Sequence, residues 1–337
     1  MSIRLLSLCA SGILLLSGCS SKQYFEPEVT YEAEGVQSRY EGKIVDLSRN
    51  GATLEDGRYI GKKGISSVRL GEGYRFLSES GRFILASNID GKLKIIDKKR
   101  GKAYKTIELG LPVVSANIKN GLIAYVLSSN TFGLYRIKDG KKLIENRSEQ
   151  TFAIDTRAAS PMFVDSLVVM PMLDGKLVIF DTHDPENASV IYLSSDRAFN
   201  NVIYLGRTGD TLVAATPKKL LTLGSEGEFE YKANIAEVVV SKGKVYLLTK
   251  EGRIVKFDMK LNELAHKKFK FAQYSAATVL NGKVYALEKQ GSLIVLNDKL
   301  TKYKIYEVGE VDSPVFISGS KLYKDGEIIH LDRLGYE

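Results

Sequence analysis

Residues 243–258 read Gly-Lys-Val-Tyr-Leu-Leu-Thr-Lys-Glu-Gly-Arg-Ile-Val-Lys-Phe-Asp, and residues 282–297 read Gly-Lys-Val-Tyr-Ala-Leu-Glu-Lys-Gln-Gly-Ser-Leu-Ile-Val-Leu-Asn. The two stretches lie 39 residues apart and share one order of apolar runs and glycines. Short runs rich in β-branched and aromatic residues are typical of strands, and the Lys-Glu-Gly and Lys-Gln-Gly sequences between them are typical of hairpin turns. Each stretch therefore predicts a pair of antiparallel strands.

Further copies of this pattern run through most of the chain. A third copy ends with residues 175–181, Gly-Lys-Leu-Val-Ile-Phe-Asp, and a fourth with residues 91–97, Gly-Lys-Leu-Lys-Ile-Ile-Asp. One marker residue per copy lies at the corresponding turn: Gly57, Gly91, Phe132, Gly175, Lys218, Gly252, Gly291 and Gly326. Successive markers are 34, 41, 43, 43, 34, 39 and 35 residues apart. Four short strands that recur about every 40 residues are the signature of a β-propeller.

We therefore predict an all-β fold, a β-propeller built from four-stranded blades. Eight markers favour eight blades, and seven is the alternative if the first marker belongs only to a closing strand. Helical repeats of similar length need long stretches with a 3.6-residue period, and the chain shows none. No outermost strand follows residues 328–331. We expect an N-terminal strand within Val29–Val45 to complete the last blade and close the ring, which protects the sheet edge.

The first residues resemble an export signal. Residues 5–16 form an apolar run behind Arg4 that is too short to cross a membrane. The run ends at Leu16-Ser17-Gly18-Cys19, which resembles the lipobox of bacterial lipoproteins. That resemblance implies that Cys19 is lipidated and becomes the new N-terminus; an ordinary cleaved signal is the alternative. The predicted organisation is a signal peptide at 1–18, a lipidated tether at 19–40 and a single propeller domain at 41–337.

The residues after the cysteine bear on localisation. Ser20 and Ser21 follow Cys19, and no Asp stands beside it. By resemblance to Gram-negative lipoproteins, this favours sorting to the outer membrane, with acyl chains such as palmitate in the membrane and the propeller facing the periplasm. Cleavage removes Cys9, so the mature chain keeps one cysteine and forms no internal disulfide.

Composition excludes several classes of protein. The 337 residues are 44% hydrophobic and 26% charged, as in ordinary folded domains. With 2 Cys, 3 His and no Trp, neither a disulfide-stapled scaffold nor a zinc-ribbon site is expected. His183, His266 and His330 fall in different repeats, without the spacing that places two ligands on one face. The formal charge is +8, and no aromatic-rich surface for nucleic acid is predicted.

Positive charge is densest in two short runs. One is Lys98-Lys99-Arg100 with Lys102, and the other is Lys267-Lys268 with Lys270. Both fall at predicted turns or outer strands, where a solvated surface explains them without any function. The functional alternative is contact with anionic lipopolysaccharide head groups or with an acidic protein face, which would weaken with salt.

The fourth copy carries a family resemblance. It continues through residues 97–102, Asp-Lys-Lys-Arg-Gly-Lys, and resembles the pyrroloquinoline-quinone-like repeat. The positions that match are Gly91, Leu93, Asp97, Gly101 and Lys102. The threonine of the repeat is replaced by Arg100 and its docking tryptophan by Lys105. We expect three tyrosines to take over part of the packing: Tyr104, Tyr246 and Tyr285.

Quinone-dependent dehydrogenases share this repeat. For such an enzyme the resemblance implies an Asp base, a calcium ion held by Glu and Asn, a Trp beneath the quinone and often a vicinal disulfide. This chain has no Trp and no Cys pair. Asp97, Asp181 and Asp258 recur at one position of the repeat, where an Asp begins a turn by bonding its own backbone. We therefore predict no catalytic residues, no metal and no cofactor, and a protein that is not an enzyme.

A propeller of this repeat behind a lipobox resembles the BamB family, lipoproteins of the outer-membrane β-barrel assembly machinery. The resemblance implies a protein-binding scaffold, monomeric within a complex, whose loops on one face dock the outer-membrane barrel-assembly protein. One alternative is a periplasmic propeller that binds a small molecule or glycan in its central channel, which converging acidic or aromatic side chains would favour. A channel plugged by small apolar side chains would favour the scaffold. The quinone-dependent dehydrogenase is the disfavoured third reading.

Overall fold

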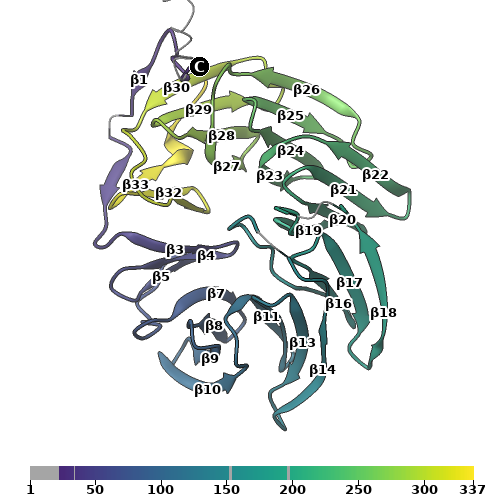
Figure 1. Cartoon of the computed structure of the whole chain (residues 1–337). Coiled ribbons are helices and arrows are strands. Elements are labelled where there is room, and N and C mark those ends of the chain that lie inside the picture. Colours follow the sequence, from purple (N-terminus) through teal and green to yellow (C-terminus); the bar gives the residue numbers. More distant parts are fainter. Residues whose placement is uncertain (1–22, 34, 152–153, 196–197) are drawn as a thin grey trace, which may run out of the picture.

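The computed structural model describes residues 23–33, 35–151, 154–195 and 198–337. Eight antiparallel sheets follow one another around a ring, which makes the chain an eight-bladed β-propeller (Figure 1). The predicted all-β propeller with eight blades is confirmed, and the seven-bladed alternative is wrong. Helix in the described ranges is confined to one 3₁₀ turn, Leu331–Arg333. The predicted signal peptide and Cys19 lie outside the described residues.

Blades 1 to 4 each run from the innermost to the outermost strand in chain order. Blade 1 contains β3 (Ile44–Ser48), β4 (Gly51–Leu54), β5 (Tyr59–Gly61) and β6 (Gly64–Ile65). Blade 2 contains β7 (Arg75–Ser80), β8 (Phe83–Ser87), β9 (Lys92–Asp97) and β10 (Lys102–Glu108). Blade 3 contains β11 (Val113–Lys119), β12 (Leu122–Leu127), β13 (Thr131–Arg136) and β14 (Lys141–Arg147). Blade 4 contains β15 (Met162–Val164), β16 (Leu167–Pro171), β17 (Lys176–Asp181) and β18 (Asp184–Tyr192).

Blades 5 to 7 repeat this order, and blade 8 takes its outermost strand from the N-terminal part. Blade 5 contains β19 (Tyr204–Thr208), β20 (Thr211–Ala215), β21 (Lys219–Gly224) and β22 (Gly227–Lys232). Blade 6 contains β23 (Ile235–Ser241), β24 (Lys244–Thr249), β25 (Arg253–Phe257) and β26 (Glu263–Lys268). Blade 7 contains β27 (Tyr274–Leu280), β28 (Lys283–Glu288), β29 (Ser292–Asn297) and β30 (Tyr303–Glu307). Blade 8 contains β31 (Phe316–Ser318), β32 (Lys321–Lys324), β33 (Glu327–His330) and β2 (Gln37–Arg39).

The middle strands of each blade are apolar on both faces. On β28, Val284, Tyr285, Ala286 and Leu287 are all buried. Both faces are covered because each sheet packs between the two neighbouring blades, as in a stack of sheets. On β17 the face that carries Lys176 is mixed in composition, yet Lys176 and Leu177, on opposite sides of the strand, are both buried.

One turn recurs in every blade, between its second and third strands. Seven of the eight sequence markers lie in this turn, and Phe132 lies two residues after the corresponding Asn130. The six glycine markers have φ between 79° and 93°, a region that favours glycine. The carbonyl of the turn residue accepts a hydrogen bond of 2.8–3.1 Å from the N–H that follows the outermost strand. The acceptor–donor pairs are Gly57–Leu70, Gly91–Leu109, Asn130–Ser148, Gly175–Leu193, Lys218–Ala233, Gly252–Phe269, Gly291–Val308 and Gly326–Tyr40.

Blade 8 is completed by residues from the two ends of the described chain. β2 pairs antiparallel with β33, with Ser38 opposite Ile328. In Figure 1 the purple strand accordingly lies beside the yellow β33. β2 falls within Val29–Val45, so the predicted closing strand is confirmed. A contact that was not predicted precedes it: β1 (Tyr31–Glu32) pairs in parallel with β30, the outer strand of blade 7.

Two tyrosines on second strands, Tyr246 and Tyr285, pack against the next blade of the ring. Tyr246 and Tyr285 are almost fully buried, as expected, but Tyr104 lies on an outermost strand and is 54% exposed, so its predicted packing role is wrong. The Tyr246 hydroxyl donates to Asp298 Oδ1 at 2.5 Å, and Lys256 Nζ lies 2.5 Å from Asp298 Oδ2. Because Asp298 follows β29, this carboxylate links blade 7 to blade 6.

Candidate functional site

The ring presents two faces that differ in the segments they carry. The connection face holds the marker turns and the connections between blades, and the hairpin face holds the turns between the first and second and between the third and fourth strands. Both faces rest on a closed frame of hydrogen-bonded strands. Loops held by a rigid frame are the usual location of binding residues.

Two exposed aliphatic side chains belong to neighbouring loops on the connection face of blade 2. Ile89, in the β8–β9 turn, is 80% exposed, and Leu111, in the β10–β11 connection, is 43% exposed. The two loops touch at Gly91, where an added Cβ would lie 2.4 Å from the Leu111 backbone nitrogen. Asn88 fixes the turn by accepting a 2.8 Å hydrogen bond from the Lys92 N–H. The turn itself gives no structural reason for an apolar residue at position 89, whereas a partner surface would.

The centre of the ring holds a charged pair that spans blades 1 and 6. Arg49, at the β3–β4 turn, donates from Nη2 to Glu237 Oε1 at 2.7 Å and to the Val238 carbonyl at 3.2 Å. The side chains of Arg49 and Glu237 are 23% and 16% exposed. On the same innermost strand, Val45 and Leu47 are exposed, so apolar side chains border the pair.

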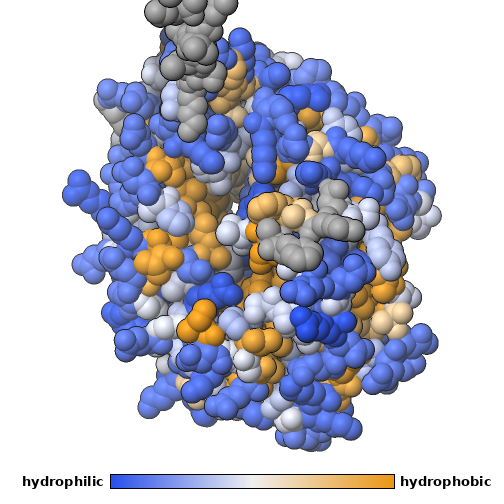
Figure 2. Space-filling view, in the orientation of Figure 1, coloured by the Kyte–Doolittle hydropathy of each residue, from blue (hydrophilic) through white to orange (hydrophobic). Residues whose placement is uncertain are grey.

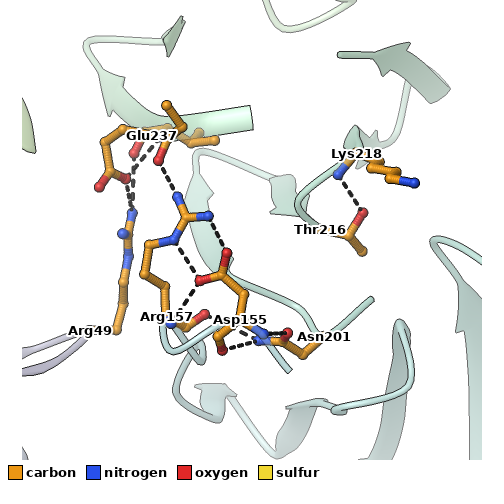
Figure 3. Close-up of polar contacts among 9 residues, drawn as sticks. Arg49, Asp155, Arg157, Asn201, Thr216, Lys218 and Glu237 are labelled. Carbon is orange, nitrogen blue, oxygen red and sulfur yellow. Dashed lines mark hydrogen bonds and ion pairs between the residues drawn. The ribbon is translucent and has the colours of Figure 1, made fainter. Parts of the chain in front are cut away.

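A second charged pair comes from the long connection between β14 and β15. Arg157 chelates Asp155, with Nε and Nη2 donating at 2.7 and 2.5 Å, and also donates to the Ala236 carbonyl of blade 6 (Figure 3). Asn201 Nδ2 donates to the Asp155 and Arg157 carbonyls at 3.1 and 3.3 Å.

Residues 160 and 161 tie the same connection to two more blades. Asn50 of blade 1 donates to Ser160 Oγ at 2.7 Å, and Asn117 of blade 3 donates to the Pro161 carbonyl at 3.0 Å. The described part of this connection therefore crosses the centre of the ring.

Each charged side chain of these two pairs at the centre of the ring lies beside one of opposite charge. Burial would lower the pKa of Arg49, but the Glu237 carboxylate outweighs it and holds the pKa above its ordinary value. Burial would raise the pKa of Asp155, but the Arg157 hydrogen bonds hold it below its ordinary value. Arg49 and Asp155 therefore both stay ionised near neutral pH. Among the described residues, the centre holds the paired acids Glu237 and Asp155 and the ring of Tyr204, whose centroid lies 5.0 Å from the Arg49 guanidinium carbon.

The aspartates that recur in the sequence lie in turns, as predicted. Asp97 Oδ1 accepts hydrogen bonds from the Lys99 and Arg100 N–H groups. Asp181 Oδ1 and Asp258 Oδ1 likewise each accept one from the N–H group two residues further along. These carboxylates fix the hairpins between third and fourth strands. They lie in different blades, so they do not converge on one site.

The three histidines lie apart and each has a local partner. His183 contacts Asp181, His266 contacts Glu263, and Ser38 contacts His330. Within the ranges that the structure covers, no group of three or more His, Cys, Asp or Glu side chains could hold a metal ion. Over the same ranges, no helix is long and apolar enough to span a membrane.

Several features of the site were not predicted. Arg49 and Glu237 are 188 residues apart in the chain, and neither belongs to a local motif. Ile89 could have been noticed as an apolar residue within the polar turn Asn88–Gly91. Figure 2 shows hydrophilic residues over most of the rim and hydrophobic patches nearer the middle of the ring.

The strand order and the closing strand define an eight-bladed β-propeller, and comparisons with known proteins agree. No family model matches the sequence. The chain is 33% and 32% identical to the plasminogen-binding protein PgbB of two Helicobacter pylori strains, with alignments that cover 96% of this chain and 68% of each relative. The chain therefore belongs to the family of PgbB.

Solved structures show the same fold at low sequence identity. BamB from Moraxella catarrhalis superposes with a TM-score of 0.69 at 16% identity, over 87% of this chain and 97% of that one. The C-terminal WD40 domain of Sif2 gives a TM-score of 0.65 at 12% identity, over 88% and 98%. The predicted likeness to BamB is confirmed for the fold.

Proposed function

We propose that this protein is a lipid-anchored scaffold that binds a partner protein through the connection face of blade 2. The observation that carries the proposal is the pair Ile89 and Leu111, two large aliphatic side chains exposed on loops that the frame holds in contact. Apolar residues on rigid loops lose little conformational freedom on binding, which favours affinity. The paired charges at the ring centre support binding over catalysis.

The anchor is the second element of the proposal. The lipobox-like sequence Leu16-Ser17-Gly18-Cys19 supports a diacylglyceryl group on Cys19, and the residues that follow it support retention at the periplasmic side of the outer membrane. Buried methylene groups contribute about 0.8 kcal/mol each, so several acyl chains anchor a protein stably. Cys19→Ala should release the protein into the soluble periplasmic fraction. Continued fractionation with outer membranes after a high-salt wash would show that the anchor is elsewhere.

The barrel-assembly protein of the outer membrane is the partner that the BamB likeness suggests. The test is an affinity pull-down of the tagged, lipidated protein from detergent-solubilised outer membranes, read by mass spectrometry against an equally abundant lipoprotein. Ile89→Glu with Leu111→Glu should abolish recovery of the partner. The matched control is Leu167→Glu on the hairpin face, where the leucine is 40% exposed. Equal recovery by the control and the double variant would place the interface elsewhere.

Plasminogen is a second candidate ligand, favoured by membership in the PgbB family. The test is binding of soluble plasminogen to the immobilised chain, with the same double variant and control. Saturable binding at micromolar concentration would support an additional role at an exposed surface. Binding that does not saturate, or that is equal on an unrelated basic protein, would remove plasminogen from the proposal.

A further inference from the structure

The point where the N-terminal segment leaves the ring is fixed by one aromatic residue. Phe25 is 9% exposed and packs edge-to-face on Phe269, with ring centroids 6.0 Å apart. Its core cluster includes Tyr246 of blade 6 and Ile305 of blade 7. Beyond Phe25, the chain continues along the outer strand of blade 7 as β1. The segment therefore leaves the ring at the junction of blades 6 and 7.

The length of chain between this exit and Cys19 is short. Gln23 is four residues after Cys19, and an extended chain spans at most about 3.6 Å per residue. An acyl group on Cys19 would thus enter the membrane within roughly 14 Å of Gln23. Any surface beside Gln23 must then face the membrane at close range.

Gln23 borders a recess on the connection face of blade 6. The recess has a volume of about 350 Å³. Its lining residues are Gln23, Lys250, Glu251, Lys268, Lys270, Phe271 and Gln273. Lys268 and Lys270 belong to the basic run noted in the sequence, and Lys250 joins them from the β24–β25 turn. Folding therefore gathers three lysines from two separate segments.

The charge of this surface is positive. Lys250, Lys268 and Lys270 are exposed, and none of them makes an ion pair with another described residue. The one acid of the recess, Glu251, accepts a 2.5 Å hydrogen bond from Asn234 Nδ2. Two exposed acids, Glu26 and Glu28, follow Phe25 on the way to β1 and so lie beyond the exit point.

An aromatic residue projects from the same surface. Phe271 is 37% exposed, and its φ of 67° lies in the left-handed region that bulky residues seldom adopt. Lys270 Nζ lies 4.8 Å from its ring centroid. Tyr24, next to the exit point, is 49% exposed. Aromatic rings among lysines are the composition of surfaces that sit at a membrane interface.

We propose that Lys250, Lys268, Lys270 and Phe271 form a membrane-docking surface for the anionic phospholipid head groups of the membrane that holds the lipid anchor. The inference rests on the proposed function for the anchor at Cys19, while the charges and the exit point are independent of it. A lipid anchor combined with a basic patch holds a protein in a defined orientation, because the two attachments act together. Blade 6 then faces the membrane.

The first test uses the absence of tryptophan from the chain. Phe271→Trp introduces a single fluorophore into the Cys19→Ala protein, exported by an ordinary cleaved signal and therefore free of lipid. Vesicles of phosphatidylglycerol should shift its emission to the blue, and vesicles of phosphatidylcholine should not. The control is Tyr104→Trp, at an exposed position on β10 of blade 2, which should show no shift. Equal shifts at both positions, or none at 271, would overturn the proposal.

The second test compares two triple lysine variants by vesicle sedimentation. Lys250→Ala, Lys268→Ala and Lys270→Ala together should weaken binding to phosphatidylglycerol vesicles at least tenfold, since each lysine near an anionic surface contributes roughly fivefold. The charge-matched control, which should bind as the parent does, is Lys99→Ala, Lys102→Ala and Lys141→Ala. Binding should also fall as salt is raised. Equal loss in both triple variants would overturn the proposal.

These tests separate the inference from the proposed function. The lipid-free protein reports on the docking surface alone, and the fractionation of Cys19→Ala after a high-salt wash, which removes electrostatic binding, reports on the anchor alone. Vesicle binding together with fractionation that persists through a high-salt wash supports the docking surface and contradicts the anchor. Loss of membrane fractionation without vesicle binding supports the anchor and contradicts the docking surface.

Discussion

Glycine is required at the marker turn both for its left-handed backbone conformation and for the lack of space for a Cβ. Two glycines of blade 7 allow these two requirements to be measured separately. Gly291 has a φ of 93°, and an added Cβ would lie 2.0 Å from the Gly309 carbonyl oxygen. Gly282, in the preceding turn of blade 7, has a φ of 75° and no atom within 4 Å of its added Cβ. The backbone conformation favours glycine at both positions, but only at Gly291 would a side chain also clash with a neighbouring backbone.

We expect Gly282→Ala to lower the free energy of unfolding by about 1 kcal/mol, the cost of left-handed backbone for alanine. Gly291→Ala should lower it by about 3 kcal/mol, because a backbone contact must also give way. Denaturant unfolding of both variants measures the difference. Equal effects would mean that the close contact at the marker turn does not constrain the blade.

Asp298 gives blades 6 and 7 a link that depends on pH. Hydrogen bonds from Lys256 and Tyr246 hold its pKa below the ordinary 3.8. Because the folded protein then binds this proton less tightly, the stability that Asp298 contributes is complete above about pH 4 and is lost as the pH falls through the lowered pKa. Asp298→Asn should cost about 1 kcal/mol at neutral pH, since the side chain is half exposed and screened.

Unfolding curves of wild type and Asp298→Asn, recorded from about pH 7 to about pH 2, test this link. The gap in unfolding free energy should be constant down to about pH 4 and then shrink. A gap that widens on acidification would contradict the assigned ionisation of Asp298.

Individual side chains were predictable only where their role is local. Asp97 acts on the backbone of its own hairpin, and this role follows from its position in the repeat. The Arg49–Glu237 pair joins blades at distant points of the chain, so no spacing rule reveals it. Lys250 reaches the docking surface in the same way, because the fold and not the sequence places it beside Lys270.

The closing strand β2 is the element whose loss should affect the ring most. It covers the edge of β33, and the Tyr40 N–H that follows it donates to the Gly326 carbonyl, as in every other blade. Upstream, Phe25 adds its ring to the core of blades 6 and 7. The N-terminal segment thus fastens three blades.

Deletion of residues 20–40 should lower the melting temperature by at least about 5 °C, because several kcal/mol of packing and pairing are removed. Deletion of residues 20–22 alone is the control and should leave the melting temperature unchanged. Thermal unfolding followed by circular dichroism measures both. An unchanged melting temperature after the longer deletion would show that blade 8 is stable with three strands.

The strands themselves were largely predictable from the sequence, and the N-terminal contacts were predictable only in part. Alternating apolar runs and turn glycines recur in each repeat, so the blades and the closing strand follow from pattern and topology. β1 is two residues long and pairs in parallel, and neither property leaves a periodic signal. The charged residues at the centre come from a connection between blades, where no repeat constrains the sequence.

The two proposed surfaces lie on the same connection face, at opposite sides of the ring. Blades 2 and 6 are four blades apart in a ring of eight, and Figure 1 shows β8 and β9 across the ring from β25 and β26. If the membrane contacts the ring at blade 6, the loops that carry Ile89 and Leu111 lie at the far side of the ring, four blades away. This arrangement leaves the partner-binding surface accessible while the protein is anchored.

Site-specific photo-crosslinking in living cells tests this arrangement most directly. A photoreactive amino acid at position 89 should crosslink to one partner protein, and a photoreactive amino acid at position 271 should crosslink to lipid. Position 167, on the hairpin face, should give neither product. The same crosslinked proteins from positions 89 and 167, or a protein instead of lipid at position 271, would contradict an anchored scaffold that binds its partner through blade 2.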